Sequence, residues 1–270
     1  MQEPVVSVVM PVYNSAAWLR EAMDSILQQT FSDFELILID DGSTDESASI
    51  IKSFSDSRIR HLVNEKNRGL VFTLNRGIDE AKGKYIARMD GDDIAVDRRF
   101  ERQVSYLDSH PEVDLIASVV LLIDDKGNKT GFWKEDKEML SYEQLREFMP
   151  FNNCIAHPSI MARAGVLRDF KYRQDQDQAE DYDLWLRLFA AGKIIHKIEE
   201  PLLLHRILAG SYTRKRQRNI FFKLADTKWR FFKNEVRHKH VNEFIVRTML
   251  FSFYDVIRGA GKQIKNLIKS

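Results

Sequence analysis

Three short segments of this chain, 5–10, 34–39 and 85–89, are mostly apolar. Apolar runs of this length predict strands that are buried on both faces of a parallel sheet. Between them apolar residues recur at helical spacing, as they do over 70–81. This alternation predicts an α/β fold, with a doubly wound, mostly parallel sheet of the Rossmann-like, nucleotide-binding type.

Each of the three runs ends in a polar cluster. The clusters are Pro11-Val12-Tyr13-Asn14, Asp40-Asp41-Gly42-Ser43 and Asp90-Gly91-Asp92-Asp93. Ligands of open α/β sheets bind beyond the carboxyl ends of the strands. We therefore expect the three clusters to line one crevice.

Further elements follow from local patterns. Ser43-Thr44-Asp45-Glu46 fits a capping box that opens a helix. We also expect a helix over 97–109, short strands over 113–116 and 119–123, and a helix that begins near Glu180.

Composition bounds the class of protein. The 270 residues are 44% hydrophobic and 30% charged, which is typical of a globular chain and not of a disordered one. The single cysteine, Cys154, excludes an intramolecular disulfide. The N-terminus lacks the basic region of a signal peptide, and no run reaches the roughly 18 apolar residues of a spanning helix. We therefore expect a cytoplasmic protein.

Charge is unevenly distributed along the chain. Residues 214–270 contain 15 Lys and Arg against 4 Asp and Glu, a surplus of +11, whereas residues 1–213 carry −10. The shift divides the chain into a catalytic domain, 1–213, and a basic amphipathic helical tail, 214–270. In the tail basic and aromatic residues interleave, as over 228–233. This pattern predicts peripheral attachment to the inner face of an anionic membrane, or alternatively packing of the aromatic face on the catalytic domain. The acidic body argues against nucleic acid as a partner.

The Asp90-Gly91-Asp92-Asp93 cluster is the sharpest chemical signal. Mg²⁺ and Mn²⁺ favour carboxylate oxygens together with substrate phosphates, and the glycine permits a tight turn beside a diphosphate. Other candidates have structural alternatives when taken singly. Tyr13 can stack on a base or simply pack, and the acids at Glu180 and Asp181 can serve a helix N-terminus.

Taken together, the motifs resemble those of family 2 glycosyltransferases with the GT-A fold, such as enzymes of bacterial polysaccharide and lipopolysaccharide synthesis. The motifs that match in order and spacing are Pro11-Val12-Tyr13-Asn14, the Asp40–Asp45 turn, Asn67-Arg68-Gly69, Asp90-Gly91-Asp92-Asp93 and Glu180-Asp181. The resemblance runs from about residue 5 to residue 213.

The resemblance implies a role for each matching residue. Asp181 is the expected catalytic base, Asp92 the main ligand of Mn²⁺ or Mg²⁺, and Glu180 and His157 lie on the acceptor side. The residues expected to bind the donor nucleotide are Pro11, Tyr13, Asp41, Asn67, Arg68 and Asp90.

One segment departs from the family pattern. The family often has Tyr-Arg-x-His after its last core strand, where the histidine contacts metal or phosphate. Here leucine, Leu208, stands at the histidine position. Either His205 substitutes from the opposite face of the strand, or the ligand is missing and metal binding is weaker; the second alternative is favoured.

The implied activity is inverting transfer of a sugar from a nucleotide-diphosphate sugar, with UDP the favoured nucleotide. The acceptor is a hydroxyl of a saccharide or lipid-linked saccharide in cell-surface polysaccharide synthesis. Two alternatives remain: a nucleotide-sugar-binding module without transfer activity, and a sugar-nucleotide pyrophosphorylase.

Overall fold

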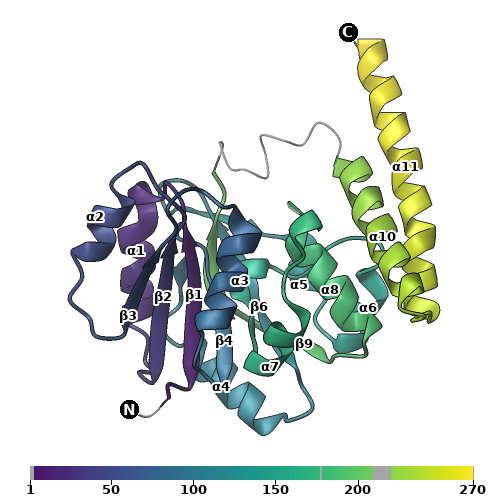
Figure 1. Cartoon of the computed structure of the whole chain (residues 1–270). Coiled ribbons are helices and arrows are strands. Elements are labelled where there is room, and N and C mark those ends of the chain that lie inside the picture. The colour runs from purple at the N-terminus through teal and green to yellow at the C-terminus, as the bar shows by residue number, and fades with distance from the viewer. Residues whose placement is uncertain (1–2, 177, 209–219, 270) are drawn as a thin grey trace.

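The computed structural model describes residues 3–176, 178–208 and 220–269, which fold around one mixed sheet (Figure 1). Its strands are β1 (Val6–Val12), β2 (Phe34–Asp40), β3 (Ile59–Val63), β4 (Tyr85–Arg88), β5 (Ile94–Ala95), β6 (Leu115–Ile123), β7 (Lys129–Phe132), β8 (Met161–Arg163) and β9 (Ile195–Arg206). Their order is β3-β2-β1-β4-β8-β6-β9-β5, with β7 paired to β6.

Strands β3, β2, β1 and β4 pair in parallel, and β6 pairs in parallel with β9. The short strand β8 lies antiparallel between β4 and β6, so these two run in the same direction. The predicted α/β fold with a mostly parallel sheet is therefore confirmed. The three apolar runs form β1, β2 and β4, which are neighbours in the sheet.

Helices cover both faces of the sheet and one end of the molecule. They are α1 (Ala16–Leu27), α2 (Ser47–Lys52), α3 (Leu70–Glu80), α4 (Arg99–Ser109), α5 (Lys134–Glu138), α6 (Tyr142–Phe148), α7 (Ala164–Phe170), α8 (Glu180–Ala190), α10 (Ile220–Arg237) and α11 (Glu243–Lys269), with 3-10 turns at His157–Ser159 and Gln174–Gln176. Alternate residues of β1 point to opposite faces: Val9 joins the core with α3 and α8, whereas Val8 and Met10 join the core with α1 and α4. This two-sided burial explains why the strands are apolar at most positions.

Two local predictions were wrong. Helix α2 begins at Ser47, and its N-cap residue, Glu46, makes no capping hydrogen bond, so the expected capping box is not formed. The carboxylate of Asp45 accepts a hydrogen bond from the Ser47 N–H at 3.0 Å. Instead, the Ser43 hydroxyl accepts a hydrogen bond from the backbone N–H of Asn14, and Asp45 accepts one from that of Ala16, so both residues join two loops. The short strands expected over 113–123 form one strand, β6, because a shift in register at Ser118 and Val120 lets its pairing with β9 continue.

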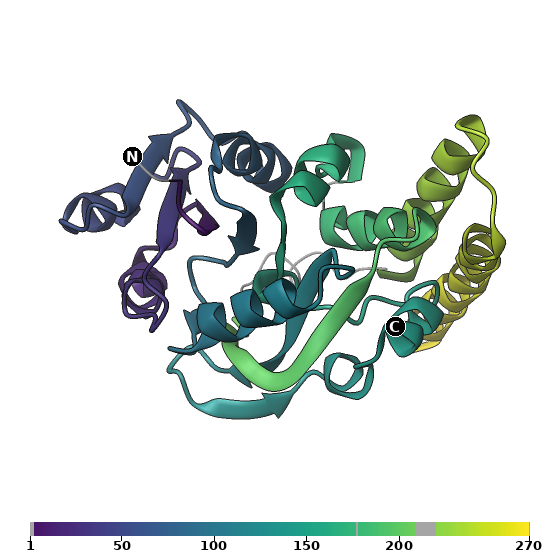
Figure 2. The ribbon, with the colours of Figure 1, turned by 90° about the horizontal axis from the view of Figure 1, so that it is seen from below.

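The described part of the basic tail forms two helices, α10 and α11, rather than one. They lie side by side at the end of the molecule opposite β3 and α2 (Figures 1 and 2). Phe231 of α10 and Phe244 of α11 are buried in the same core as Leu184 and Trp185 of α8. The tail helices therefore pack on the sheet domain, while the predicted boundary at 213 and 214 lies outside the described residues.

Among the helices of the described residues, none combines sufficient length with sufficient apolarity to cross a bilayer.

Candidate active site

The loops after β1 and β2 are joined at the carboxyl edge of the sheet. The side-chain oxygen of Asn14 accepts a hydrogen bond from the backbone N–H of Thr44 at 2.8 Å, and the N–H of Asp41 donates to the carbonyl of Val12 at 2.8 Å. Next to this junction the Tyr13 side chain is 48% exposed. The first two polar clusters therefore meet, and they leave an aromatic face open to solvent.

Asp41 holds the loop that carries Asn67 and Arg68. One carboxylate oxygen accepts hydrogen bonds from the Asn64 amide at 2.6 Å and the Arg68 N–H at 2.8 Å, and the other accepts from the Gly69 N–H at 2.9 Å. Because both oxygens are occupied and the residue is buried, Asp41 orders this loop in the structure. The sequence pattern did not predict a role for Asn64, because this residue lies outside the matched motifs.

Gly42, next to Asp41, is required by the same loop. Its φ is +72°, and a Cβ atom at this position would lie 2.8 Å from the backbone nitrogen of Asn67. A side chain there would therefore strain the turn and push the two loops apart.

The third cluster brings three carboxylates together. One oxygen from each of Asp90, Asp92 and Asp93 lies within 4.8 Å of the others. Arg88 pairs with Asp90 through two hydrogen bonds, and His205 pairs with Asp93 at 3.0 Å. Among the described residues, Asp92 is the member of the cluster that has no ion-pair partner.

Burial and crowding raise the affinity of this cluster for positive charge. Burial, together with the charges of Asp90 and Asp93, raises the pKa of Asp92 to about 7. Burial also raises the pKa of Asp90, against the charge of Arg88. Such a cluster of carboxyl groups fits a hard divalent cation, because the positive charge of the ion offsets the repulsion between the ionised carboxylates.

His205 lies against this cluster rather than away from it. Its Nδ1 is 3.0 and 3.1 Å from the two oxygens of Asp93. Burial alone would lower the pKa of His205, but Asp93, Asp90 and Asp92 raise it to about 9. Leu208 follows the end of β9 and is half-buried. The geometry thus provides an imidazole at the acidic cluster despite the leucine in the motif.

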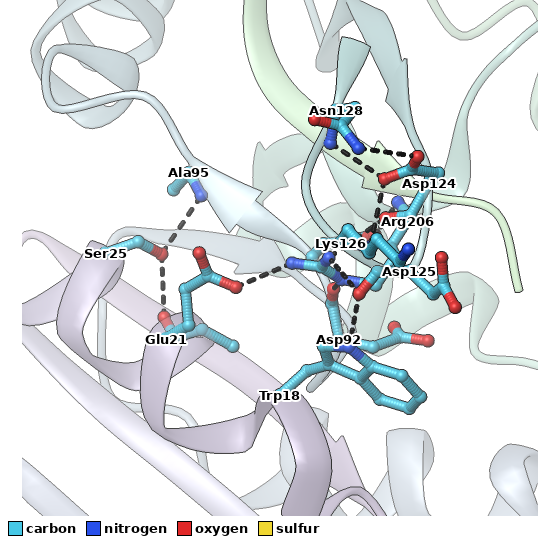
Figure 3. Close-up of polar contacts among 12 residues, drawn as sticks. Trp18, Glu21, Ser25, Asp92, Ala95, Asp124, Asp125, Lys126, Asn128 and Arg206 are labelled. Carbon is cyan, nitrogen blue, oxygen red and sulfur yellow. Dashed lines mark hydrogen bonds and ion pairs between the residues drawn. The ribbon is translucent and has the colours of Figure 1, made fainter. Parts of the chain in front are cut away.

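Arg206, the residue after His205, fixes the position of the loop Asp90-Gly91-Asp92-Asp93, which we call the aspartate loop (Figure 3). Its guanidinium donates to the carbonyl of Asp92 at 2.8 Å, to the carboxylate of Glu21 at 2.6 Å and to the carbonyl of Asp124 at 3.0 Å. The Trp18 indole N–H donates to the neighbouring carbonyl of Asp125 at 3.3 Å. One buried arginine therefore ties the aspartate loop to α1 and to the turn between β6 and β7.

Asp181 stands in the first turn of α8. Its carboxylate accepts hydrogen bonds from the Asn153 amide at 2.9 Å and from the adjacent Tyr182 N–H at 2.7 Å. Burial raises the pKa of Asp181, and the hydrogen bond from Tyr182 and the charge of Arg88 oppose the shift. The charge of Arg88 lowers the pKa of both Asp181 and Asp90, so the start of α8 and the aspartate loop lie within electrostatic reach of the same guanidinium.

Glu180 and His157, the two candidates for the acceptor side, are buried. Each is 7% exposed. The Nε2 atom of His157 lies 2.7 Å from the hydroxyl of Tyr172, and burial lowers the pKa of His157 well below its ordinary value. In this structure His157 supports the wall of the site from within.

Comparison with known proteins identifies the class. The family described as "Glycosyl transferase family 2" matches residues 7–170, which is more than half of the chain. The chain therefore belongs to glycosyl transferase family 2. It is 34% identical over 208 residues to the O-antigen biosynthesis glycosyltransferase WbnJ of Escherichia coli, a match that covers 75% of this chain and 80% of WbnJ.

Two solved structures share the fold at low sequence identity. S. aureus TarS in complex with UDP-GlcNAc is 17% identical, with a TM-score of 0.73 over 90% of this chain and 70% of that one. The mannosyltransferase PcManGT from Pyrobaculum calidifontis, in complex with GDP-Man and Mn²⁺, is also 17% identical, with a TM-score of 0.62 over 97% of this chain and 76% of that one. These similarities establish the GT-A-type fold.

Proposed function

We propose that this transferase moves a sugar from a UDP-sugar to a hydroxyl of a saccharide or lipid-linked saccharide in cell-surface polysaccharide synthesis. The observation that carries the proposal is the cluster of Asp90, Asp92 and Asp93 at the carboxyl edge of the sheet, with Asp181 near the same arginine. The O-antigen relative supports the class of product, and the TarS complex with UDP-GlcNAc supports the choice of nucleotide.

In this proposal the donor lies across the loops after β1, β2 and β4. Tyr13, beside Pro11, stacks on the base, and Asp41 bonds to the base or holds the loop that does so. The backbone N–H groups around Asn67 and Arg68, before α3, face the diphosphate, because a helix N-terminus favours anions. Asp90 lies nearer the ribose.

Asp92 and its neighbours fit a Mn²⁺ or Mg²⁺ ion. The raised pKa of Asp92 and the clustering of carboxylate oxygens support this assignment, and the PcManGT complex contains Mn²⁺. When bound, the ion offsets negative charge on the diphosphate leaving group. His205, paired with Asp93, adds a positive charge beside the carboxylates of this site.

Asp181 acts as the catalytic base in a single displacement. Its carboxylate accepts the proton of the acceptor hydroxyl while that oxygen bonds to the anomeric carbon. The bond from this carbon to the diphosphate breaks on the opposite face, which inverts the configuration. Asn153 holds one oxygen of Asp181, and Glu180 and His157 support the acceptor side from within.

We also propose that the enzyme works at the cytoplasmic face of a membrane, where a lipid-linked acceptor is available. The +11 surplus of residues 214–270 supports peripheral attachment to anionic lipid.

A donor panel tests the proposal. UDP-, GDP- and dTDP-sugars are scored by thermal shift with Mn²⁺, then by donor hydrolysis and by transfer to saccharide acceptors, with product anomers assigned by NMR. We expect UDP-sugars to stabilise the protein and to be consumed. Binding without turnover would instead identify a nucleotide-sugar-binding module, and release of pyrophosphate from a nucleoside triphosphate and a sugar phosphate would identify a pyrophosphorylase.

A further inference from the structure

Helix α11 exposes an apolar stripe that no described residue covers. Val246, Leu250, Phe253 and Ile257 are 44%, 64%, 55% and 69% exposed. Their spacing of four, three and four residues places them on one face of the helix. Single exposed apolar residues are ordinary on protein surfaces, but a continuous stripe of large ones indicates an interaction surface.

The opposite face of α11 packs on α10. The Ser252 hydroxyl donates to the carbonyl of Ala225 on α10 at 3.0 Å, and Asp255 pairs with the buried Lys228 at 2.6 Å. Gly259 lies so close to Phe222 that a Cβ atom there would be 2.8 Å from its ring. Since α10 covers this inner face, the exposed stripe is not required to hold the two helices together.

The charges beside the stripe indicate an anionic partner. The only acidic residue of α11 after Glu243, Asp255, is buried, while Arg247, Arg258 and Lys262 are partly exposed along the helix. Arg247 and Arg258 also pair with Glu147 and Asp255, at 3.5 and 3.7 Å. A second copy of the chain would bring like charges together at the same face. An anionic lipid surface instead accepts both the apolar stripe and its cationic flanks.

We propose that α11 lies in the plane of an anionic membrane, with Val246, Leu250, Phe253 and Ile257 at the boundary between headgroups and acyl chains. The contact face therefore differs from the one the sequence pattern favoured, around residues 228–233. In the structure Lys228 and Phe231 of that segment are buried.

This face is connected to the acceptor side by a short segment. The Phe151 ring packs against Phe251 and Tyr254 of α11, with centroids 5.5 and 6.2 Å apart. Two residues later, Asn153 donates its hydrogen bond to Asp181. A membrane-bound α11 thus holds the proposed base near the lipid surface. This consequence for catalysis rests on the proposed function, whereas the membrane-binding face of α11 does not.

Co-sedimentation with vesicles tests the inference on the full chain. Wild type and Phe253→Glu/Ile257→Glu are compared on vesicles of phosphatidylglycerol and phosphatidylcholine, and on phosphatidylcholine alone, at low salt. We expect wild type to prefer the anionic vesicles and the double variant to bind them at least about tenfold more weakly. The matched control, Val63→Glu/Phe132→Glu, places the same charges at 54% and 40% exposed positions on β3 and β7 and should bind as wild type does.

Three results would overturn the inference. Wild type could ignore anionic vesicles, or the double variant could bind them as strongly as wild type. Alternatively, light scattering without vesicles could find a wild-type dimer that the double variant abolishes, so that a second copy covers the stripe. Unchanged thermal unfolding and UDP binding in the double variant would show that it remains folded.

Turnover with a soluble saccharide acceptor separates this inference from the proposed function. Loss of vesicle binding with unchanged soluble turnover supports the lipid-contacting face. Vesicle binding by a protein that turns over no nucleotide sugar would contradict the proposed function but would still support the membrane-binding face of α11.

Discussion

The aspartate loop and the interior of the C-terminal helix pair both withdraw charged side chains at least partly from water, but in different ways. Between α10 and α11, Lys228 and Asp255 neutralise each other at 2.6 Å. In the aspartate loop Asp90 pairs with Arg88 and Asp93 with His205, and no ion-pair partner of Asp92 is found among the described residues. A paired buried charge thus specifies how two helices meet, whereas a half-buried acidic group in surplus over its partners marks a place where a ligand of opposite charge belongs.

The largest expected effect tests the surplus charge directly. Asp92→Asn keeps the shape of the side chain but removes its charge, so we expect turnover to fall by roughly a thousandfold or more, because metal-assisted charge stabilisation is worth several kcal/mol. Steady-state turnover with Mn²⁺ measures this effect. The control is Asp169→Asn, at an exposed aspartate on α7, which should retain full activity. Full activity of Asp92→Asn in EDTA would contradict the metal assignment.

The next effect concerns the base. Asp181→Asn leaves a neutral amide against the acceptor hydroxyl, and loss of a general base typically costs about 10² to 10⁴ in rate. Donor affinity, measured by calorimetry with Mn²⁺, should change little, because the proposed donor contacts lie on other loops. If turnover stays within about threefold of wild type, Asp181 serves only the start of α8 and Glu180 becomes the next candidate.

A third variant breaks the buried ion pair between α10 and α11. Asp255→Leu leaves Lys228 buried with only the Phe151 carbonyl as a described hydrogen-bond partner, so we expect a loss of about 3 kcal/mol in the free energy of unfolding. Urea unfolding measures the loss. The double variant Lys228→Met/Asp255→Leu should recover most of it, because no charge then remains uncompensated. A single variant as stable as wild type would mean that the pair does not help to hold α10 on α11.

The smallest effect is a dependence of stability on pH without metal. The pKa of Asp92 is about 7 in the folded chain and 3.8 in the reference state, so the folded state binds more protons between these values. Its stability should therefore fall as pH rises from about 4 to about 7 and then level off. Asp92→Asn lacks this loss and should gain at least about 1 kcal/mol over wild type by pH 7, measured by urea unfolding in EDTA. A constant difference across this range would show that Asp92 titrates normally.

Much of the fold was predictable because it depends on short-range patterns. The apolar runs that form β1, β2 and β4 and the helical periodicity of α3 need no knowledge of distant residues. The edge strand β3 was missed because its residues are only half-buried and lack a continuous apolar run. Arg88 is a charged residue inside an apolar run, and this exception to the pattern was a signal that an acidic partner lies nearby.

The sequence by itself determined the class of the protein. Aspartates that follow a buried strand must lie at the carboxyl edge of the sheet, whatever the rest of the chain does. The family and the candidate residues of the donor side follow from such local order and spacing.

Only the tertiary structure decided which distant groups meet. His205 reaches Asp93 across 112 positions, and Arg206 reaches the carbonyl of Asp92 across 114, because β9 returns beside β5 at the aspartate loop. The same holds for the tail: both of its helices are amphipathic, but the sequence does not state which apolar face is buried. That depends on which neighbour arrives to cover it, and α8 together with the α10–α11 contact buries Phe231 while leaving Phe253 and Ile257 exposed.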